Sequence, residues 1–308
     1  MIRTENLTKN YGKDRGVFNL NLDVPKGKIY GFIGPNGAGK TTTIKMLCGL
    51  IKPDSGKAFV GDVQVTPYNI SRIKKKIGYM PDIFGVYEQM SVWEYLDFYG
   101  AAFKIPVKQR KKRIEEVLAL TESSHMIDYQ VTSLSRGMRQ RIGLAKTLIH
   151  DPEILILDEP AGGLDPNARI EMRQTISRLK NLGKTILLSS HILPELSSVC
   201  DLVGIIFKGK LLVQGTVKEI SASLQEKIII NVTVDSDVNE AKGILERIDC
   251  VENVKILEKN LLQFTFTGAR EQIKSVLRIL IENKVVVRWF YEEEIDLEDV
   301  FLNITRRA

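Results

Sequence analysis

The chain has 308 residues, of which 44% are hydrophobic and 27% are charged, a composition typical of a globular protein with room for one large domain and one small one. No stretch approaches the roughly 18 uninterrupted apolar residues of a membrane span, and the start MIRTENLTKNYG lacks the apolar core of a signal peptide. Three widely spaced cysteines, Cys48, Cys200 and Cys250, favour reduced thiols in a cytoplasmic protein over disulfides or a zinc site.

The net charge of +6 is distributed unevenly along the chain. Residues 226–308 carry 12 Lys and Arg against 16 Asp and Glu, which leaves −4 there and +10 on residues 1–225. Two runs concentrate the positive charge, RIKKKIG (residues 72–78) and KQRKKR (residues 108–113). They are interpreted either as solvated helix faces or as contacts for anionic lipid or nucleic acid.

The first elements in chain order are strands with turns between them. Residues 16–34 predict a strand, a turn at Pro25–Gly27 and the buried strand IYGFIG. A glycine-rich loop follows, and then the helix KTTTIKMLCGLI, which is expected to end near Lys52–Pro53. Residues 57–65 (KAFVGDVQV) alternate as one further strand would.

The glycine-rich loop GPNGAGKT matches the phosphate-binding pattern G-x-x-x-x-G-K-[ST] between a buried strand and a helix. Glycines let successive N–H groups face inward and form an anion nest at the positive end of the helix. Lys40 is expected to reach the β- and γ-phosphates, and the Thr41 hydroxyl to bind Mg²⁺. The predicted nucleotide-binding residues of this loop are Gly34, Pro35, Asn36, Gly37, Ala38, Gly39, Lys40, Thr41 and Thr42.

Helical patterns dominate from Ser91 to Ile149. SVWE predicts a capping box that opens one helix, and KQRKKRIEEVLALT predicts a second. In LSRGM, Ser135 is a candidate N-cap of a third helix, yet Gly137 and three arginines crowd its first turns, where the helix dipole disfavours cations. A small, flexible and positive helix start predicts that an anion docks there.

Buried strands return in EILILDEP and KTILLSSH. Asp158 lies at the carboxyl end of the first strand, where α/β sheets bind ligands, so it is a candidate Mg²⁺ ligand through water. Glu159 is placed to orient and deprotonate an attacking water. His191 follows the second strand and is expected to reach a γ-phosphate.

The helix ARIEMRQTISRLKNLGK lies between these two strands and is expected to end at Gly183. The alternation of strands and helices predicts a parallel sheet, and DLVGIIFKGKLLVQG predicts a hairpin that turns at Lys208–Gly209. Beyond about Gln225 the order β-α-β-β-α-β predicts a small ferredoxin-like module, followed by a last helix at residues 296–307.

GPNGAGKT, LSRGM, ILILDEP, GGLD and His191, in this order and spacing, resemble the ATPase subunit of an ABC transporter over about the first 220 residues. The resemblance implies a P-loop NTPase fold with an antiparallel β subdomain and a helical subdomain. It further implies that two ATPase domains pair head to tail, with each ATP between one P-loop and the opposite LSRGM. Ser135 and Gly137 would then bind the partner's γ-phosphate, Tyr11 would stack on adenine, and Asp165 would lie in the loop that links the two sites.

Two residues depart from the family pattern. Arg136 stands where the signature LSGGQ has its first glycine, and Asp82 in YMPDIFGVY stands where the family has a glutamine that contacts Mg²⁺. Aspartate is also a good Mg²⁺ ligand, so Asp82 is kept as a candidate for the metal. The closing LEDVFLNIT resembles the tail of ATPase subunits from two-component drug, sodium or polysaccharide exporters.

The sequence therefore predicts an α/β ABC-type ATPase domain at residues 1–222, with its helical subdomain at about 87–150, and a ferredoxin-like α+β domain at 226–308. The predicted protein binds ATP and Mg²⁺, pairs with a second ATPase subunit, expected to be identical, and drives a separate polytopic permease from the inner face of the membrane. A soluble ABC-type ATPase acting on nucleic acid or ribosomes is the alternative. A non-hydrolysing nucleotide sensor would lack Glu159 or His191, and both are present.

Overall fold

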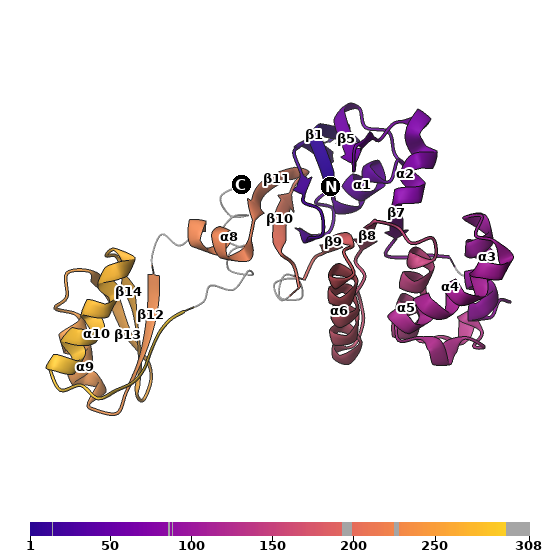
Figure 1. Cartoon of the computed structure of the whole chain (residues 1–308). Helices are drawn as coiled ribbons and strands as arrows, with labels where there is room; N and C mark the ends of the chain where they lie inside the picture. Colours follow the sequence, from indigo (N-terminus) through magenta and orange to yellow (C-terminus); the bar gives the residue numbers. More distant parts are fainter. Residues whose placement is uncertain (14, 86, 88, 193–198, 225–227, 294–308) are drawn as a thin grey trace. The chain divides into compact units, whose positions relative to one another are not determined.

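The computed structural model describes residues 1–13, 15–85, 87, 89–192, 199–224 and 228–293 (Figure 1). The chain divides into one compact unit over Met1–Ile220 and a second that begins at Ser221. The helix expected at residues 296–307 lies outside the described residues. No helix in the described part of the chain combines the length and the apolar character that crossing a bilayer requires.

A six-stranded sheet forms the centre of the first unit, in the order β11-β10-β4-β9-β8-β7. Five of its strands are parallel, as predicted: β4 (Ile29–Ile33), β7 (Ile77–Met80), β8 (Ile154–Asp158), β9 (Thr185–Ser190) and β10 (Leu202–Phe207). The edge strand β11 (Lys210–Gly215) runs antiparallel to β10, which confirms the hairpin. The parallel strands β4, β8 and β9 are buried along their whole length, so their carboxyl ends come together at one edge of the sheet.

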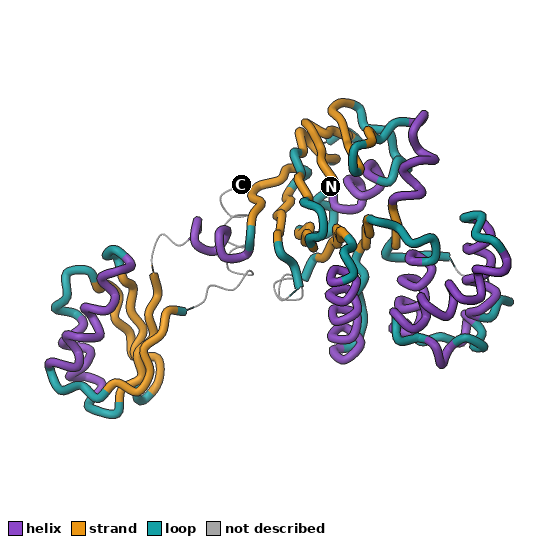
Figure 2. The backbone as a smooth tube through the Cα atoms, viewed as in Figure 1, coloured by secondary structure: helices purple, strands orange, loops and turns teal. Residues whose placement is uncertain are grey.

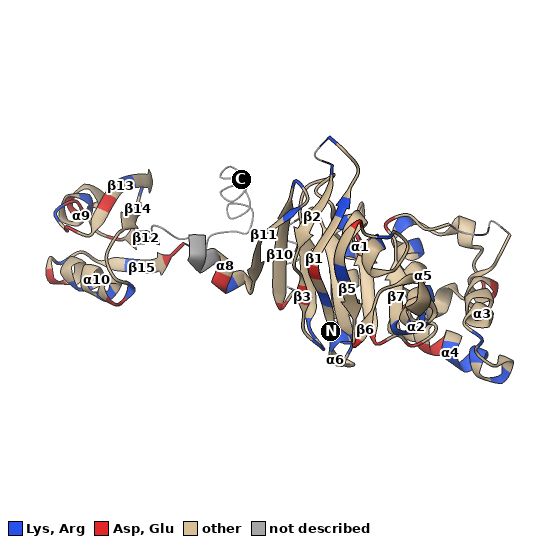
Figure 3. Ribbon diagram, turned by 90° about the horizontal axis from the view of Figure 1, so that it is seen from above, with Lys and Arg blue, Asp and Glu red and all other residues tan. Residues whose placement is uncertain are grey.

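A second, antiparallel sheet contains β1 (Ile2–Asn10), β2 (Gly16–Leu20), β3 (Asp23–Val24), β5 (Ser55–Val60) and β6 (Val63–Gln64), which lie side by side in Figure 3. The prediction of a single strand at residues 57–65 is wrong. Gly61, with φ 62°, turns the chain there, so β5 and β6 form a hairpin. One apolar core joins this sheet to the central one through Leu7, Ile44 and Ile156, among others.

The helix after the glycine-rich loop, α1 (Lys40–Leu47), is shorter than predicted. Gly49 has φ 67°, in the left-handed region that ends helices, and Cys48 is the C-cap. The expected end near Lys52–Pro53 was therefore wrong: the apolar residues Leu50 and Ile51 suggested a further turn that the glycine prevents.

Three of the remaining described α-helices of this unit lie in the segment predicted to be helical (Figure 2). α3 (Val92–Ala102) starts with the predicted capping box of Ser91 and Glu94, and α4 (Val107–Leu120) and α5 (Arg136–Leu148) pack with it. Short 3₁₀ turns occur at η1 (Pro67–Asn69), η2 (Ser124–Met126) and η3 (Val131–Ser133). The other helices are α2 (Ile70–Lys76), α6 (Pro166–Asn181) and α8 (Val217–Leu224).

The second unit has the predicted β-α-β-β-α-β order. Its strands β12 (Ile228–Val234), β13 (Val251–Glu258), β14 (Leu261–Phe266) and β15 (Val287–Glu292) form an antiparallel sheet in the order β13-β14-β12-β15. α9 (Val238–Leu245), the turn η4 (Arg270–Gln272) and α10 (Ile273–Glu282) complete it. Val232, Leu245, Phe264 and Leu280 belong to a core of its own, separate from that of the first unit.

Candidate active site

The glycine-rich loop spans the gap between the end of β4 and the start of α1. Its last residue, Gly39, is the N-cap of α1 and has φ 111°, a backbone conformation that residues with a Cβ rarely adopt. A Cβ at Gly39 would lie 3.0 Å from Val17 Cγ2 and 3.1 Å from the Gly16 carbonyl oxygen. The loop therefore needs glycine here, both for its curvature and for its close packing on β2. The free N–H groups of the first turn of α1 face the space in front of the loop.

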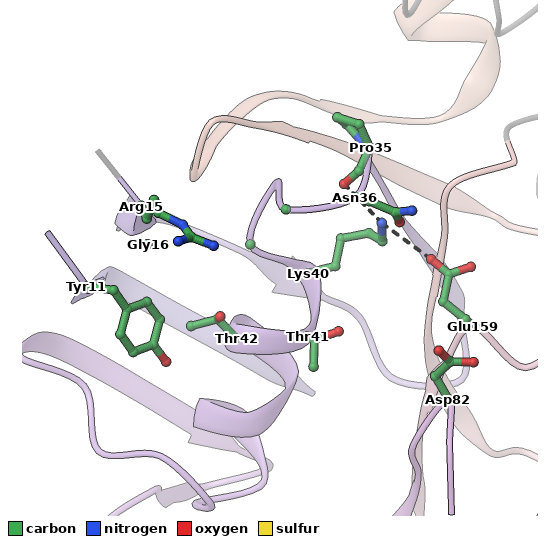
Figure 4. A pocket seen from close by; sticks show the side chains of 12 residues that line it. Tyr11, Arg15, Gly16, Pro35, Asn36, Lys40, Thr41, Thr42, Asp82 and Glu159 are labelled. Carbon is green, nitrogen blue, oxygen red and sulfur yellow. Dashed lines mark hydrogen bonds and ion pairs between the residues drawn. The ribbon is translucent and has the colours of Figure 1, made fainter. Parts of the chain in front are cut away.

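A cavity of about 520 Å³ opens in front of this loop (Figure 4). Ten of the residues predicted for the site line it: Tyr11, Pro35, Asn36, Gly37, Gly39, Lys40, Thr41, Thr42, Asp82 and Glu159. Gly34 and Ala38 form the buried side of the loop instead, where a Cβ on Gly34 would lie 2.3 Å from the Ile206 carbonyl oxygen. Tyr11 follows the end of β1 and is 54% exposed at the rim, so it is not a packed sheet aromatic.

Lys40 crosses the floor of the cavity. Its ammonium group donates to the carbonyl oxygens of Gly34 at 2.6 Å and Pro35 at 3.3 Å, and lies 3.3 Å from Glu159 Oε1. The side chain is only 6% exposed, so this charge is held by oxygen atoms from three residues. A buried cation of this kind is retained where an anion binds.

Asp158 ends β8 directly beneath Thr41. Thr41 Oγ1 donates to Asp158 Oδ2 at 2.9 Å, and Ser189 Oγ on the neighbouring strand β9 donates to Asp158 Oδ1 at 2.5 Å. Both carboxylate oxygens thus accept from hydroxyls, which hold the buried carboxylate in one orientation. Sequence reasoning missed Ser189, although a polar pair, Ser189–Ser190, at the end of an apolar strand was a visible signal.

Glu159, the next residue, has φ 50°, a strained value for a residue with a long side chain. Its N–H donates to the carbonyl oxygen and Oγ of Ser189 at 3.2 and 3.1 Å. The reversal of the backbone turns its side chain toward Lys40 on one side and His191 on the other, with His191 Nδ1 2.8 Å from Glu159 Oε2. The structure therefore brings both predicted catalytic residues into contact.

Asp82 lies after β7, on the side of the cavity facing Glu159 (Figure 4). Partial burial raises the pKa of its carboxyl group, and the nearby carboxylates of Asp158 and Glu159 raise it further. The positive charges of Arg136 and His191 oppose this shift. The carboxylates of Asp82, Asp158 and Glu159 thus influence one another, although no three His, Cys, Asp or Glu side chains of the described residues are arranged as a ligand set for a metal ion.

Ser135, Gly137 and Asp165 do not line this cavity. Ser135 and Asp165 are the N-caps of α5 and α6, where Ser135 Oγ accepts from Met138 N at 3.3 Å and Asp165 Oδ1 accepts from Ala168 N at 2.9 Å. The two helix starts meet, because a Cβ on Gly137 would lie 3.4 Å from Ala168 Cβ. Within one chain, these predicted residues form a second, separate group at the positive ends of two helices.

Two further cavity residues were not predicted. Arg15 and Gly16 line it between Tyr11 and the loop, and the Tyr11 N–H donates to the Arg15 carbonyl oxygen at 2.8 Å. The closeness of Arg15 in the sequence to Tyr11, the predicted adenine-stacking residue, could have indicated that it belongs to the site. Arg136 lines a neighbouring cavity of about 320 Å³ together with Asp82, so both departures from the family pattern occur in one place.

The chain is similar to known proteins in sequence and in fold. The family model described as ABC transporter matches residues 17–162. The chain is 33% identical to the linearmycin resistance ATP-binding protein LnrL of Bacillus subtilis, over 100% of this chain and 99% of that protein. It is 36% identical to the bacitracin transport ATP-binding protein BcrA of Bacillus licheniformis, over 99% of this chain and 97% of that protein. Among solved structures it resembles CbiO1 of Clostridium perfringens, part of the transporter complex CbiONQ, with 28% identity and a TM-score of 0.65 over 72% of this chain and 90% of that one.

Proposed function

The chain belongs to the ABC transporter family of ATP-binding, ATP-hydrolysing proteins, and from that premise we propose that it pairs with a second ATPase subunit and drives a separate membrane permease in export. One observation carries the proposal: Lys40, Asp158, Glu159 and His191 converge by direct contacts at the glycine-rich loop. Relatives named for antibiotic resistance and transport support export over action on nucleic acid or ribosomes. The permease would hold the chain at the inner face of the membrane.

The chain's own residues supply the nucleotide site. Gly37, Gly39, Lys40, Thr41 and Thr42 line the cavity, and the N–H groups at this helix start would surround the β-phosphate. Tyr11 at the rim would stack on the adenine ring. Lys40 holds three oxygen partners that a phosphate could replace. A γ-phosphate at Lys40 would also release Glu159 from its ion pair, leaving that carboxylate free to accept a proton from water.

The residues present fit a bound Mg²⁺ ion. Thr41 Oγ1 and Asp158 Oδ2 are hard oxygen donors 2.9 Å apart, and Asp82 adds a third oxygen donor on the cavity wall. Mg²⁺ usually takes only one or two carboxylates and completes its shell with water and phosphate oxygens. When bound, the ion would neutralise charge on the β- and γ-phosphates.

Hydrolysis requires that a water be held in line with the γ-phosphate and lose a proton. Glu159 is the base that we propose, because its carboxylate reaches the cavity and its backbone is held by two hydrogen bonds to Ser189. His191 would orient Glu159 through the contact at 2.8 Å and would approach the γ-phosphate from the same side. Ser189 thus holds the carboxylate of Asp158 and the backbone of Glu159 from one strand.

The second group of predicted residues would complete the site from another subunit. Ser135 and Gly137 stand at the positive start of α5, are small and do not line the chain's own cavity, so they would be available to a partner's γ-phosphate. Asp165 at the start of α6 lies beside them and would link the two sites. We propose a head-to-tail homodimer with two ATP molecules at its interface.

The substitution Glu159→Gln tests this function. It should lower the ATPase rate by about a hundredfold or more, because the general base is lost while the shape is kept. The variant should also accumulate as an ATP-bound dimer, measured by light scattering during gel filtration. Glu153→Gln, the same change at the exposed start of the same segment, is the matched control. A Glu159→Gln variant that stays monomeric under saturating ATP would refute the proposed dimer.

A further inference from the structure

Two basic runs that are separate in the sequence meet on one groove of the first unit. The groove has a volume of about 650 Å³ and is lined by Lys75 from α2, by Lys108, Lys112 and Arg113 from α4, and by the apolar side chains of Phe103, Ile105 and Ile149. Figure 3 shows the concentration of basic residues along α4. We propose that this groove and its lysine rim bind the surface of an anionic phospholipid bilayer directly.

The inner charges of the groove are already neutralised. Arg113 donates to the carbonyl oxygens of Leu148 and Ile149 at 2.7 and 3.1 Å, and so caps the end of α5. It also pairs with Glu116 at 3.1 Å and Asp151 at 3.3 Å, and Lys184 pairs with Asp151 at 2.7 Å. Both carboxylates of the groove are therefore held by cations that belong to the fold.

The outer lysines have no such partners. Among the residues that the structure describes, Lys75 and Lys108, which line the groove, form no ion pair with a carboxylate. Lys112 reaches Glu116 only at 4.0 Å and is 82% exposed. Lys75, Lys108 and Lys112 thus bring three exposed ammonium groups to one groove, and these repel one another unless an anionic surface compensates them.

The stability of the helices explains only one of the two basic runs. Lys74, Lys75 and Lys76 occupy the last turn of α2, where cations interact favourably with the helix dipole. Lys108 stands in the first turn of α4, which contains no acidic residue, and cations are unfavourable there. The positive start of α4 adds to the field of its lysines, and this feature favours an external anion over a structural role.

Apolar groups beside the lysines favour a bilayer over nucleic acid. Phe103 is 39% exposed at the groove, and Val107, at the start of α4, is 72% exposed. Phe103 also lines an adjoining apolar cavity of about 210 Å³ with Leu50 and Tyr99. Basic residues mixed with exposed aromatic and aliphatic side chains suit the headgroup region, where lysines meet phosphates and apolar groups reach the acyl boundary.

This inference goes beyond the proposed function, because the chain itself contacts lipid without the permease. The experiment uses the full chain, without nucleotide, in flotation assays with phosphatidylcholine vesicles and with vesicles that contain about 30% phosphatidylglycerol. We expect binding to the anionic vesicles only, and a loss of binding as salt rises to about 0.5 M. Equal binding to both kinds of vesicle, or none to either, would overturn the proposal while leaving the ATPase function intact.

The triple variant Lys75→Gln, Lys108→Gln and Lys112→Gln should lower the vesicle partition coefficient at least about tenfold. The matched control removes the same charge from exposed lysines elsewhere in this unit, by Lys57→Gln, Lys210→Gln and Lys218→Gln, and should lower partition about threefold or less. Both variants should keep the basal ATPase rate. An equal loss in both variants would show a general charge effect, and a loss of duplex DNA binding with unchanged vesicle binding would assign the face to nucleic acid; either result would overturn the proposal.

Discussion

At the scale of single residues, two adjacent carboxylates acquire different environments. Asp158 is 2% exposed beneath Thr41 and accepts from two hydroxyl groups. Glu159 reverses the backbone at φ 50° and carries its side chain to Lys40 and His191. Neighbouring carboxyl groups with separate surroundings can divide metal binding and proton transfer between them. The backbone of Glu159 is strained because its side chain is turned away from that of Asp158 toward Lys40 and His191.

Asp82 is the residue whose replacement tests how this site differs from its family. Asp82→Gln removes a carboxylate that stands close to Asp158 and Glu159, and it restores the longer amide expected from the family pattern. We expect ATP affinity to be retained while the hydrolysis rate or its coupling to transport changes about fivefold, the effect of altering one polar contact by about 1 kcal/mol. ATP binding by calorimetry and phosphate release would measure both. Unchanged ATPase and unchanged transport would contradict this expectation.

At the scale of elements, α5 connects the signature region to the basic groove. Ser135 caps its start, and Arg113 of α4 caps its end through the carbonyl oxygens of Leu148 and Ile149. Between them, the Lys146 ammonium group lies 4.9 Å from the ring centre of Phe84 and 5.2 Å from that of Tyr99. One helix thus holds a predicted anion contact at one end and a wall of the groove proposed to bind lipid at the other.

Lys146, which lies in α5, makes the free energy of unfolding of the protein depend on pH. Burial lowers the pKa of its ammonium group to about 8. Below pH 8 the folded state bears the full cost of the buried charge, and between about pH 8 and pH 10.4 the unfolded state binds more protons, so stability rises with pH. Lys146→Met should therefore stabilise the protein at pH 7 by about 3 kcal/mol at most, less whatever the two ring contacts contribute.

The stability gained by Lys146→Met should disappear by about pH 10, where the wild-type lysine is neutral in the folded state. Urea unfolding at pH 7 and pH 10 would measure the difference, with Lys57→Met at an exposed position as the control. A variant that is less stable by the same amount at both pH values would show that the aromatic contacts outweigh the desolvation of the charge.

At the scale of the whole molecule, the two units have separate cores and opposite net charges. None of the residues that line the glycine-rich loop cavity belongs to the second unit. α8 starts in the first unit with a capping pair, in which Thr216 N donates to Glu219 Oε2 at 2.8 Å and Glu219 N donates to Thr216 Oγ1 at 3.2 Å. The nucleotide site is therefore expected to be complete without the second unit.

A fragment of residues 1–224 tests this independence. It should fold and bind ATP within about threefold of the affinity of the full chain, because less than about 0.7 kcal/mol of binding energy would come from elsewhere. Calorimetry on both proteins would measure the affinities, and Lys40→Ala in the fragment should abolish binding as the control. A soluble, folded fragment that fails to bind ATP would assign the second unit a part in the nucleotide site.

The sequence by itself determined the phosphate loop, the buried strands β4, β8 and β9, the β-α-β-β-α-β order of the second unit, the caps at Ser91 and Ser135, and the family. These features depend on local spacing, on turn residues and on the periodicity of apolar side chains, all of which are visible along one segment. The same local reasoning failed where an apolar run continued past a glycine, at the end of α1 and in the β5–β6 hairpin. In both places a left-handed backbone at Gly49 or Gly61 overrode the hydrophobic pattern.

Only the tertiary structure decided which distant residues meet. Ser189 reaches Asp158 because β8 and β9 are neighbours in the sheet, and strand order is not encoded in either strand alone. The lysines of α2 and α4 share a groove for the same reason. Ser135 and Gly137 do not line the chain's own cavity, and this depends on where α5 packs. Packing between elements is determined by the burial of apolar surface between distant segments rather than by local sequence.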